Sequence, residues 1–168
     1  MRHSLTILMV SMALLWACNP AAKDKVSMSE QEVNEVQSSQ DYEPGTWIED
    51  WDQAIATAKT QNRTVLVNFT GSDWCGWCKR LSSEVFTQEA FTKYARENLI
   101  LLKLDFPHQI EQSVALKQQN DKLMRQFGVQ GYPTILLVDE EGKEIGRTGY
   151  QPGGVEAYIE HLKELQIH

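Results

Sequence analysis

The stretch Trp74-Cys75-Gly76-Trp77-Cys78-Lys79 determines how the rest of the chain is interpreted. It follows an apolar, β-branched run that predicts a buried strand, and a helical pattern follows it. Cysteines at this spacing lie on one face of a helix, so their sulfurs can meet in a small disulfide ring. The unpaired N–H groups and partial positive charge of a helix N-terminus favour a thiolate on Cys75. The stretch therefore predicts a redox-active pair, with Cys75 as nucleophile and Cys78 as resolving thiol.

Two other roles for this cysteine pair stay open, a purely structural disulfide and one half of a zinc site. A structural zinc site usually takes four Cys or His ligands, often as two Cys-X-X-Cys pairs. This chain has no second pair, and its remaining cysteine and histidines are scattered at Cys18, His3, His108, His161 and His168. We therefore expect no metal. No organic cofactor is needed either, because the cysteines themselves carry the electrons.

The composition sets the broad class of protein. The chain has 168 residues, of which 42% are hydrophobic and 23% charged, as in a globular protein with one domain and additional segments. A formal net charge of −7 argues against a nucleic-acid partner. Three cysteines are too few for a disulfide-stabilised scaffold.

Residues 1–17 resemble a bacterial secretion signal. A short basic start precedes the apolar run Leu5–Trp16, which is too short to span a membrane as a helix. Leu15 and Ala17, ahead of Cys18, resemble a lipoprotein signal, in which cleavage precedes a lipidated cysteine. We expect an exported periplasmic protein with a lipid anchor on Cys18. An ordinary cleaved signal, or an uncleaved anchor with Cys18 incidental, stays open.

The next segment, residues 18–45, is polar and poor in aromatic side chains, which predicts a flexible tether. Pro44-Gly45 marks its end, so we expect the folded domain over residues 46–168.

The folded part alternates predicted strands and helices. Apolar β-branched runs indicate strands, and helical periodicity of apolar residues indicates helices. Strands are expected near Trp47–Ile48 and over residues 64–70, 99–106, 135–138 and 144–149. Helices are expected near 50–60, from the cysteine motif through 86, over 88–97 and 111–127, and from 152 onward, with a hairpin turn at 139–142. Parallel early strands and a final antiparallel hairpin predict an α/β fold, a mixed central sheet sandwiched by helices.

At this point the chain resembles thioredoxin. The resemblance is carried by the cysteine motif after an apolar strand, by Leu102-Lys103-Leu104-Asp105, by Val129-Gln130-Gly131-Tyr132-Pro133-Thr134 and by the terminal hairpin and helix. It covers about residues 46–166 and points in particular to secreted bacterial thioredoxin-like domains. It implies a thioredoxin fold, thiol–disulfide exchange with protein substrates, and a redox partner that donates or accepts electrons. We expect a monomer.

The resemblance also implies a substrate groove beside the cysteines. In that family the proline at position 133 is cis, and the backbone of Tyr132 pairs with an extended substrate strand; without the family, a trans proline at a strand start would be the simpler interpretation. Trp74 and Trp77 are expected to rim an exposed sulfur. Trp74 serves either packing or substrate contact, whereas Trp77 is expected to be exposed. Gly76 and Trp77 replace thioredoxin's Gly-Pro, so its reduction potential does not transfer.

One departure from the family concerns proton transfer. Asn68 stands where thioredoxin has a buried aspartate that helps move protons to and from the resolving thiol, and an amide cannot act as a general base. Lys103 matches the usual lysine partner of that aspartate. Water, Lys103 or a carboxylate such as Asp73 or Glu84 takes over this role, or exchange is slower. Asp73 fits a solvated loop position or a helix cap equally well.

The direction of electron flow is not determined by these motifs. The thioredoxin-like string around the cysteines favours a reductase or interchange protein, and an oxidase or isomerase is the alternative. Potentials in this superfamily span about −270 to −120 mV, and nothing in the sequence selects a value. A peptide-binding or chaperone module with little turnover is the alternative from a different class.

Overall fold

The computed structural model describes residues 42–167. The predicted signal over 1–17, the lipidation site Cys18 and the tether up to residue 41 lie outside the described residues. Tyr42 packs into the hydrophobic core, and its hydroxyl oxygen accepts the Gly45 N–H at 3.3 Å. Among the described residues, Tyr42 thus already contributes to the core of the domain.

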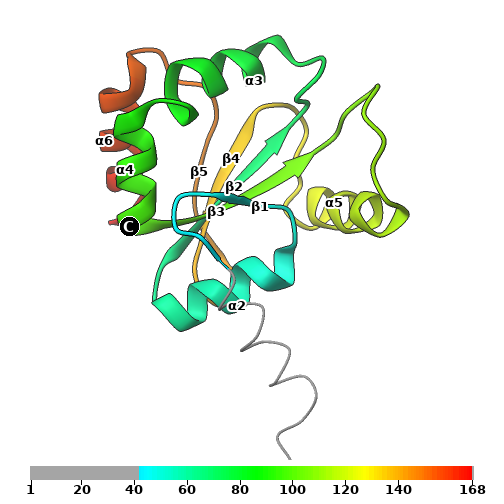
Figure 1. Cartoon of the computed structure of the whole chain (residues 1–168), viewed down its shortest axis with the longest axis horizontal. Helices are drawn as coiled ribbons and strands as arrows, with labels where there is room; N and C mark the ends of the chain where they lie inside the picture. The colour runs from blue at the N-terminus through cyan, green and yellow to red at the C-terminus, as the bar shows by residue number, and fades with distance from the viewer. Residues whose placement is uncertain (1–41, 168) are drawn as a thin grey trace, which may run out of the picture.

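A five-stranded mixed sheet forms the centre of the molecule (Figure 1). Its strands are β1 (Trp47–Ile48), β2 (Thr64–Thr70), β3 (Leu99–Asp105), β4 (Thr134–Val138) and β5 (Glu144–Thr148), in the order β1-β3-β2-β4-β5. Strands β1 and β2 run parallel to β3, whereas β4 is antiparallel to both β2 and β5. The predicted mixed sheet, with an antiparallel hairpin at one edge, is confirmed.

Helices cover both faces of this sheet. They are α2 (Trp51–Gln61), α3 (Gly76–Leu81), α4 (Glu89–Asn98), α5 (Val114–Gln126) and α6 (Gly154–Gln166), with a π-helical turn η1 (Ser82–Phe86) directly after α3. Figure 1 shows α4 and α6 on one side of the sheet and α5 on the other. Side chains of α2 and α5 pack against one face, and those of η1, α4 and α6 against the opposite face.

The alternation of side chains along β2 divides the core into two clusters. Val65, Val67 and Phe69 pack on the side of α2 and α5, whereas Leu66 packs on the side of α3, α4 and α6. Successive strand residues point to opposite faces, and both faces are covered here. Burial on both faces explains why β2 is one nearly continuous apolar run. The strand ends at Thr70, and α3 begins shortly after it at Gly76.

Helix α5 is shorter than predicted. The sequence suggested residues 111–127, but the helix begins at Val114 because the Ser113 Oγ accepts the Leu116 N–H at 3.2 Å and caps it. Gly128 has a φ of 60° just after the helix, as expected for a residue that ends a helix. The β3–α5 connection is consequently longer than predicted, and it lies beside the cysteine motif.

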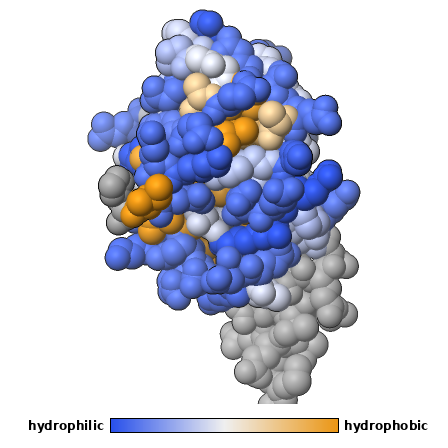
Figure 2. Space-filling model, turned by 90° about the vertical axis from the view of Figure 1, so that its left-hand side faces the viewer, coloured by the Kyte–Doolittle hydropathy of each residue, from blue (hydrophilic) through white to orange (hydrophobic). Residues whose placement is uncertain are grey.

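The outer surface of the α4 and α6 side is mostly hydrophilic, with small separate apolar spots (Figure 2). Within residues 42–167, no helix combines the length and apolar character that crossing a membrane requires.

Candidate redox site

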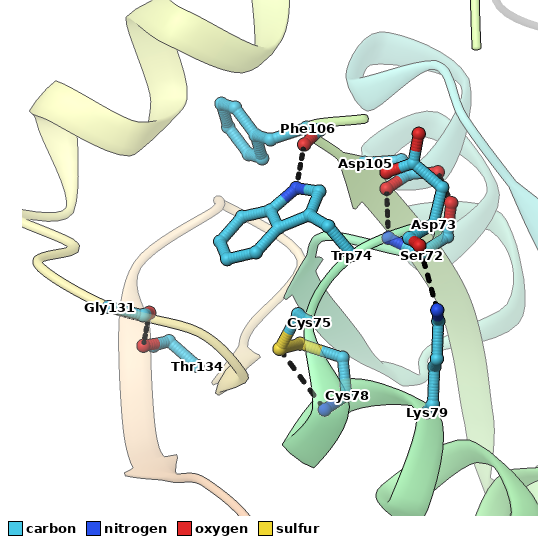
Figure 3. Close-up of a disulfide and its surroundings, with 10 residues drawn as sticks. All are labelled: Ser72, Asp73, Trp74, Cys75, Cys78, Lys79, Asp105, Phe106, Gly131 and Thr134. Carbon is cyan, nitrogen blue, oxygen red and sulfur yellow. Dashed lines mark hydrogen bonds between the residues drawn. A yellow bond between two sulfur atoms is a disulfide. The ribbon is translucent and has the colours of Figure 1, made fainter. Parts of the chain in front are cut away.

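Cys75 and Cys78 form a disulfide at the start of α3 (Figure 3). Cys75 caps the helix, and its Sγ accepts the Cys78 N–H at 3.1 Å. The predicted position of the pair, at a strand-to-helix junction, is confirmed. The expectation of an exposed sulfur is wrong, because each cysteine is only 5% exposed. The physical reason is the cap itself, which turns the Cys75 side chain back toward the helix backbone.

The loop before Cys75 is tied to the end of β3 by hydrogen bonds. The Ser72 backbone N–H donates to the Asp105 carboxylate at 2.9 Å, and the Ser72 hydroxyl donates to the same carboxylate. The Trp74 indole N–H donates to the Phe106 carbonyl at 2.8 Å (Figure 3). The active-site loop and the start of the β3–α5 connection therefore form one connected unit.

Asp73 connects the same two segments. Its carboxylate accepts the backbone N–H of His108 at 3.0 Å and that of Gln109 at 2.6 Å. Desolvation alone would raise the pKa of Asp73, but the N–H groups of Gln109 and His108 outweigh it and hold the pKa of this carboxyl below its usual value. Asp73 is thus neither a purely solvated loop residue nor the cap of α3.

Trp74 is packed on one side and exposed on the other, so the packing role considered for it is present and substrate contact stays a prediction. Its indole stacks on the His108 ring, with centroids 4.5 Å apart and an interplanar angle of 6°, and meets the Tyr132 ring edge-on. It also lies over Gly71, where an added Cβ would come within 2.4 Å of the indole. The side chain nevertheless remains 41% exposed.

Trp77, between the two cysteines in the chain, is 56% exposed, as predicted. Its ring lies 5.1 Å from that of Tyr150, and the Arg80 guanidinium packs over both rings. Glu84 accepts hydrogen bonds from the Tyr150 hydroxyl and the Arg80 Nε, each at 2.7 Å. These two bonds, Tyr150 first, hold the pKa of Glu84 below its usual value. Glu84 thus serves to fix the ring cluster beside Trp77.

The Tyr132–Pro133 peptide bond is cis, as the resemblance implied. The loop that carries it is held by a hydrogen bond from the Thr134 hydroxyl to the Gly131 carbonyl at 2.8 Å (Figure 3). The Tyr132 ring contacts Trp74, so this loop and the cysteine loop are in direct contact.

A family model described as "Thioredoxin-like domain" matches residues 51–163. The chain belongs to the thioredoxin-like family.

Similar proteins fit that assignment. The "Disulfide bond reductase DsbH" of Chlamydia pneumoniae is 33% identical over 115 residues, which cover 68% of this chain and 69% of that protein. A solved structure titled "DsbH Oxidoreductase" superposes with a TM-score of 0.70 at 31% identity, covering 73% of this chain and 84% of that one. The "Thiol:disulfide interchange protein DsbD" of Actinobacillus pleuropneumoniae is 35% identical over 86 residues, 51% of this chain but 13% of that protein. The predicted class, a thioredoxin-fold thiol–disulfide oxidoreductase, is confirmed.

Asn68, which stands where thioredoxin has a buried aspartate, is itself buried in this structure. Asn68 is 8% exposed, and its Oδ1 has no hydrogen-bond partner among the described residues. It lies two residues after Leu66 on β2 and therefore points to the same face of the sheet, the one covered by α3. Its register partner on β3 is Lys103, whose Nζ pairs with the Glu49 carboxylate at 2.8 Å. The neutral amide is thus buried where thioredoxin has a carboxylate, and the lysine has another acid as partner.

Two residues of this thioredoxin-like site were not found from the sequence. His108 supports Trp74, and Tyr150 supports Trp77, although they lie far from the cysteines in the chain. Both occur in connections without periodicity, which carry no pattern for such contacts. Among residues 42–167, no group of three or more His, Cys, Asp or Glu side chains is placed to hold a metal ion.

Proposed function

We propose that this chain is an exported thiol–disulfide reductase that acts on protein disulfides through Cys75 and Cys78. The observation that carries the proposal is the disulfide across the first turn of α3, in which the Cys75 Sγ already accepts a backbone N–H. The names of its relatives, a disulfide bond reductase and an interchange protein, support the reducing or interchange direction.

In the first step, the Cys75 thiolate attacks one sulfur of a substrate disulfide. A bond forms between the Cys75 Sγ and that sulfur, and the other substrate sulfur leaves as a thiolate and takes up a proton. The Cys78 N–H, 3.1 Å from the Cys75 Sγ, and the positive end of α3 stabilise negative charge on the attacking atom. Cys75 is therefore the nucleophile.

In the second step, Cys78 loses its proton and attacks the Cys75 sulfur. This reforms the protein disulfide, and the second substrate sulfur leaves as a thiol. Two electrons thus pass from the protein to the substrate, with one proton from Cys78 and one from the solvent, which received it when Cys75 ionised. Asp73 and Glu84 already accept hydrogen bonds that organise the loops, and Asn68 cannot accept a proton at neutral pH. Water carries this proton, because the Lys103 ammonium that pairs with Glu49 has no lone pair to accept it.

We also propose that the protein is held at a membrane on the periplasmic side by lipid on Cys18. The apolar run that ends at this cysteine, and the polar segment over residues 18–45, support the proposal. Labelled fatty acid should enter the protein and be lost in Cys18→Ala. Equal labelling of that variant would rule out lipidation at Cys18.

A peptide-binding module with little turnover is the second candidate. The observation that favours it is the low exposure of both cysteines, 5% each, beneath a rim of aromatic side chains. Reduction of insulin by the full chain and by Cys75→Ser separates the two functions. A reductase loses the activity in the variant, whereas a binding module shows no turnover in either protein and retains its partner in both.

The direction of electron flow is tested by titration with glutathione redox buffers, with the fluorescence of Trp74 and Trp77 as the signal. A potential of about −230 mV or lower supports a reductase with a dedicated electron donor. A potential above about −180 mV indicates an oxidase or isomerase instead.

A further inference from the structure

Asn68 carries a buried oxygen atom without a hydrogen-bond partner. The residue is only 8% exposed, and within residues 42–167 its Oδ1 is the one buried side-chain nitrogen or oxygen atom that has no partner. A buried acceptor in this state costs free energy, because it has lost its hydrogen bonds to water. The structure is that of the disulfide form, so this cost belongs to the oxidised protein.

Neither neighbour of Asn68 in the sheet supplies a donor. On one side lies Lys103 of β3, whose Nζ donates to the Glu49 carboxylate at 2.8 Å. On the other side lies Ile135 of β4, which is apolar and 0% exposed. A partner for the Asn68 Oδ1 therefore has to come from the layer that covers this face of the sheet, which includes α3.

Helix α3 brings Cys78 over Asn68. Leu66 of β2 and Leu81 of α3 belong to one core cluster. Because β2 and β3 are parallel, the connection between them, which begins with α3, runs back against the direction of β2.

The spacing along the two elements completes this placement. From Leu81, three residues toward the start of α3 lead to the buried Cys78, a rise of about 4.5 Å. From Leu66, two residues toward the end of β2 lead to Asn68 on the same face, a rise of about 6.6 Å. Both steps go to the same edge of the sheet, which places the Cys78 side chain above Asn68.

The redox state of Cys78 decides whether it can serve as a donor. In the disulfide, neither sulfur carries a hydrogen atom. Reduction breaks the bond between Cys75 and Cys78, while two thiol groups of the reductant give up two electrons and two protons and become a disulfide. Cys78 then carries a hydrogen atom. A thiol is a weak hydrogen-bond donor, and the oxygen of an amide side chain is an acceptor.

We propose that the Asn68 Oδ1 accepts a hydrogen bond from the Cys78 thiol, and that this bond exists only in the reduced protein. The inference deepens the proposed function and rests on it, because it requires a cysteine pair that passes between disulfide and dithiol. The bond favours the dithiol. It therefore makes the protein easier for its redox partner to reduce, and Asn68 raises the reduction potential without taking up a proton.

The first test compares the full chain with Asn68→Leu, which has a similar size and no acceptor. Both proteins are equilibrated with glutathione redox buffers at one pH, and tryptophan fluorescence reports the fraction of disulfide. The substitution removes the unpaired oxygen from the oxidised form and the hydrogen bond from the reduced form. The equilibrium should therefore move toward the disulfide by at least about 5-fold. This corresponds to a reduction potential that is about 20 mV lower.

Thr57→Val is the matched control for this titration. Thr57 is 0% exposed, and its hydroxyl donates to the Gln53 backbone carbonyl at 2.7 Å within α2, which covers the other face of the sheet. The substitution also replaces a buried polar group by an apolar one of similar size. It should leave the redox equilibrium unchanged.

Unfolding in denaturant separates the hydrogen bond from a change in packing, since altered packing affects both redox forms alike. The oxidised form of Asn68→Leu should gain stability relative to its reduced form. The gain in the folding equilibrium constant should be the same factor of at least about 5, because the two measurements close one thermodynamic cycle.

Cys78→Ala removes the donor itself. The effect of Asn68→Leu on unfolding is measured under reducing conditions in the wild-type protein and in this variant. It should be more favourable in the variant by at least about 5-fold in the folding equilibrium constant, whereas independent sites would give equal effects.

Failure of this bond and failure of the proposed function give different results. If no glutathione buffer converts the cysteine pair, or if the wild-type chain reduces no protein disulfide, the proposed function is wrong. If the pair converts but the shift in Asn68→Leu is smaller than expected, or goes toward the dithiol, the function stands and the hydrogen bond does not. Equal effects of Asn68→Leu with and without the Cys78 sulfur would also overturn the inference.

Discussion

The backbone N–H of Gln109 donates a 2.6 Å hydrogen bond to the Asp73 carboxylate, across a separation of 36 residues in the chain. Together with the bond from the His108 N–H, it holds the β3–α5 connection against the cysteine loop. The His108 ring is thereby kept stacked on Trp74. The surface around the disulfide is thus built by two segments that the sequence separates.

Removal of the Asp73 carboxylate should loosen this connection. In Asp73→Ala the amide groups of His108 and Gln109 lose their acceptor, so their hydrogen exchange should accelerate at least about 10-fold, whereas amides within β2 should keep their protection. Exchange measured by NMR on the oxidised protein checks this. Asp52→Ala, which changes an acid in the first turn of α2, serves as the control. Unchanged exchange at His108 and Gln109 would contradict the assigned role.

The same bonds predict a pH dependence. The pKa of Asp73 is lower in the folded protein than in the unfolded chain, so its contribution to stability is complete above the unfolded pKa and is lost as pH falls through the folded pKa. Acidification below the usual range of an aspartate should therefore accelerate amide exchange at His108, after correction for the intrinsic pH dependence. In Asp73→Asn this acid-induced loss should be absent.

A methyl group at position 71 should displace Trp74. The added Cβ of Gly71→Ala would lie 2.4 Å from the indole, so either the indole or the loop must move. We expect a loss of about 1–3 kcal/mol in unfolding free energy and a changed tryptophan emission. Denaturant unfolding and fluorescence measure both. Gly131→Ala is the control, because nothing lies within 4 Å of its added Cβ, and this variant should keep the wild-type emission.

A carboxylate at position 68 should change the pH profile of catalysis. In Asn68→Asp, burial raises the pKa of the new acid and makes it a candidate proton acceptor. In thioredoxin the acid at this position helps move protons to and from the resolving thiol, so we expect disulfide reduction to accelerate about 10-fold or more above the new pKa. The variant should also lose stability as pH rises from the unfolded pKa of the introduced carboxyl group towards its folded pKa, because the folded pKa is the higher one.

The control for this experiment is Asn68→Leu, which has a similar size and no acid. Its pH profile should follow that of the wild-type protein. If the pH profile of Asn68→Asp coincides with those of the wild-type protein and Asn68→Leu, the residue at position 68 takes no part in proton transfer to or from Cys78.

The C-terminal helix is anchored to the end of β5 by a buried hydroxyl. Tyr158 is 1% exposed, burial raises the pKa of its hydroxyl, and that hydroxyl donates to the Gly149 carbonyl at 3.0 Å. Tyr158→Phe keeps the ring but leaves this carbonyl without its donor, so unfolding free energy should fall by about 1–2 kcal/mol. Denaturant unfolding measures the change. An unaltered midpoint would show that the carbonyl finds another partner.

Much of the fold follows from local patterns. The apolar run of β2, the helical periodicity on either side of it and the turn at residues 139–142 suffice to predict a mixed sheet between helices, since these signals depend on neighbours along the chain. The cysteine pair and the cis bond at Pro133 were also found, the first from its spacing and the second from the resemblance to thioredoxin. The start of α5 was missed because Ser113 caps it three residues later than the apolar pattern suggests.

The sequence by itself determined the order of the elements, the identity of the redox pair and the absence of a carboxylate at Asn68. Only the tertiary structure decided that Asp73 binds the β3–α5 connection, that His108 supports Trp74, and that Cys75 is covered. The physical reason is the separation along the chain between the residues that interact. Periodicity and spacing report how a residue relates to its neighbours in the chain, whereas hydrogen bonds and ring contacts across more than 30 residues depend on how the strands place their ends side by side.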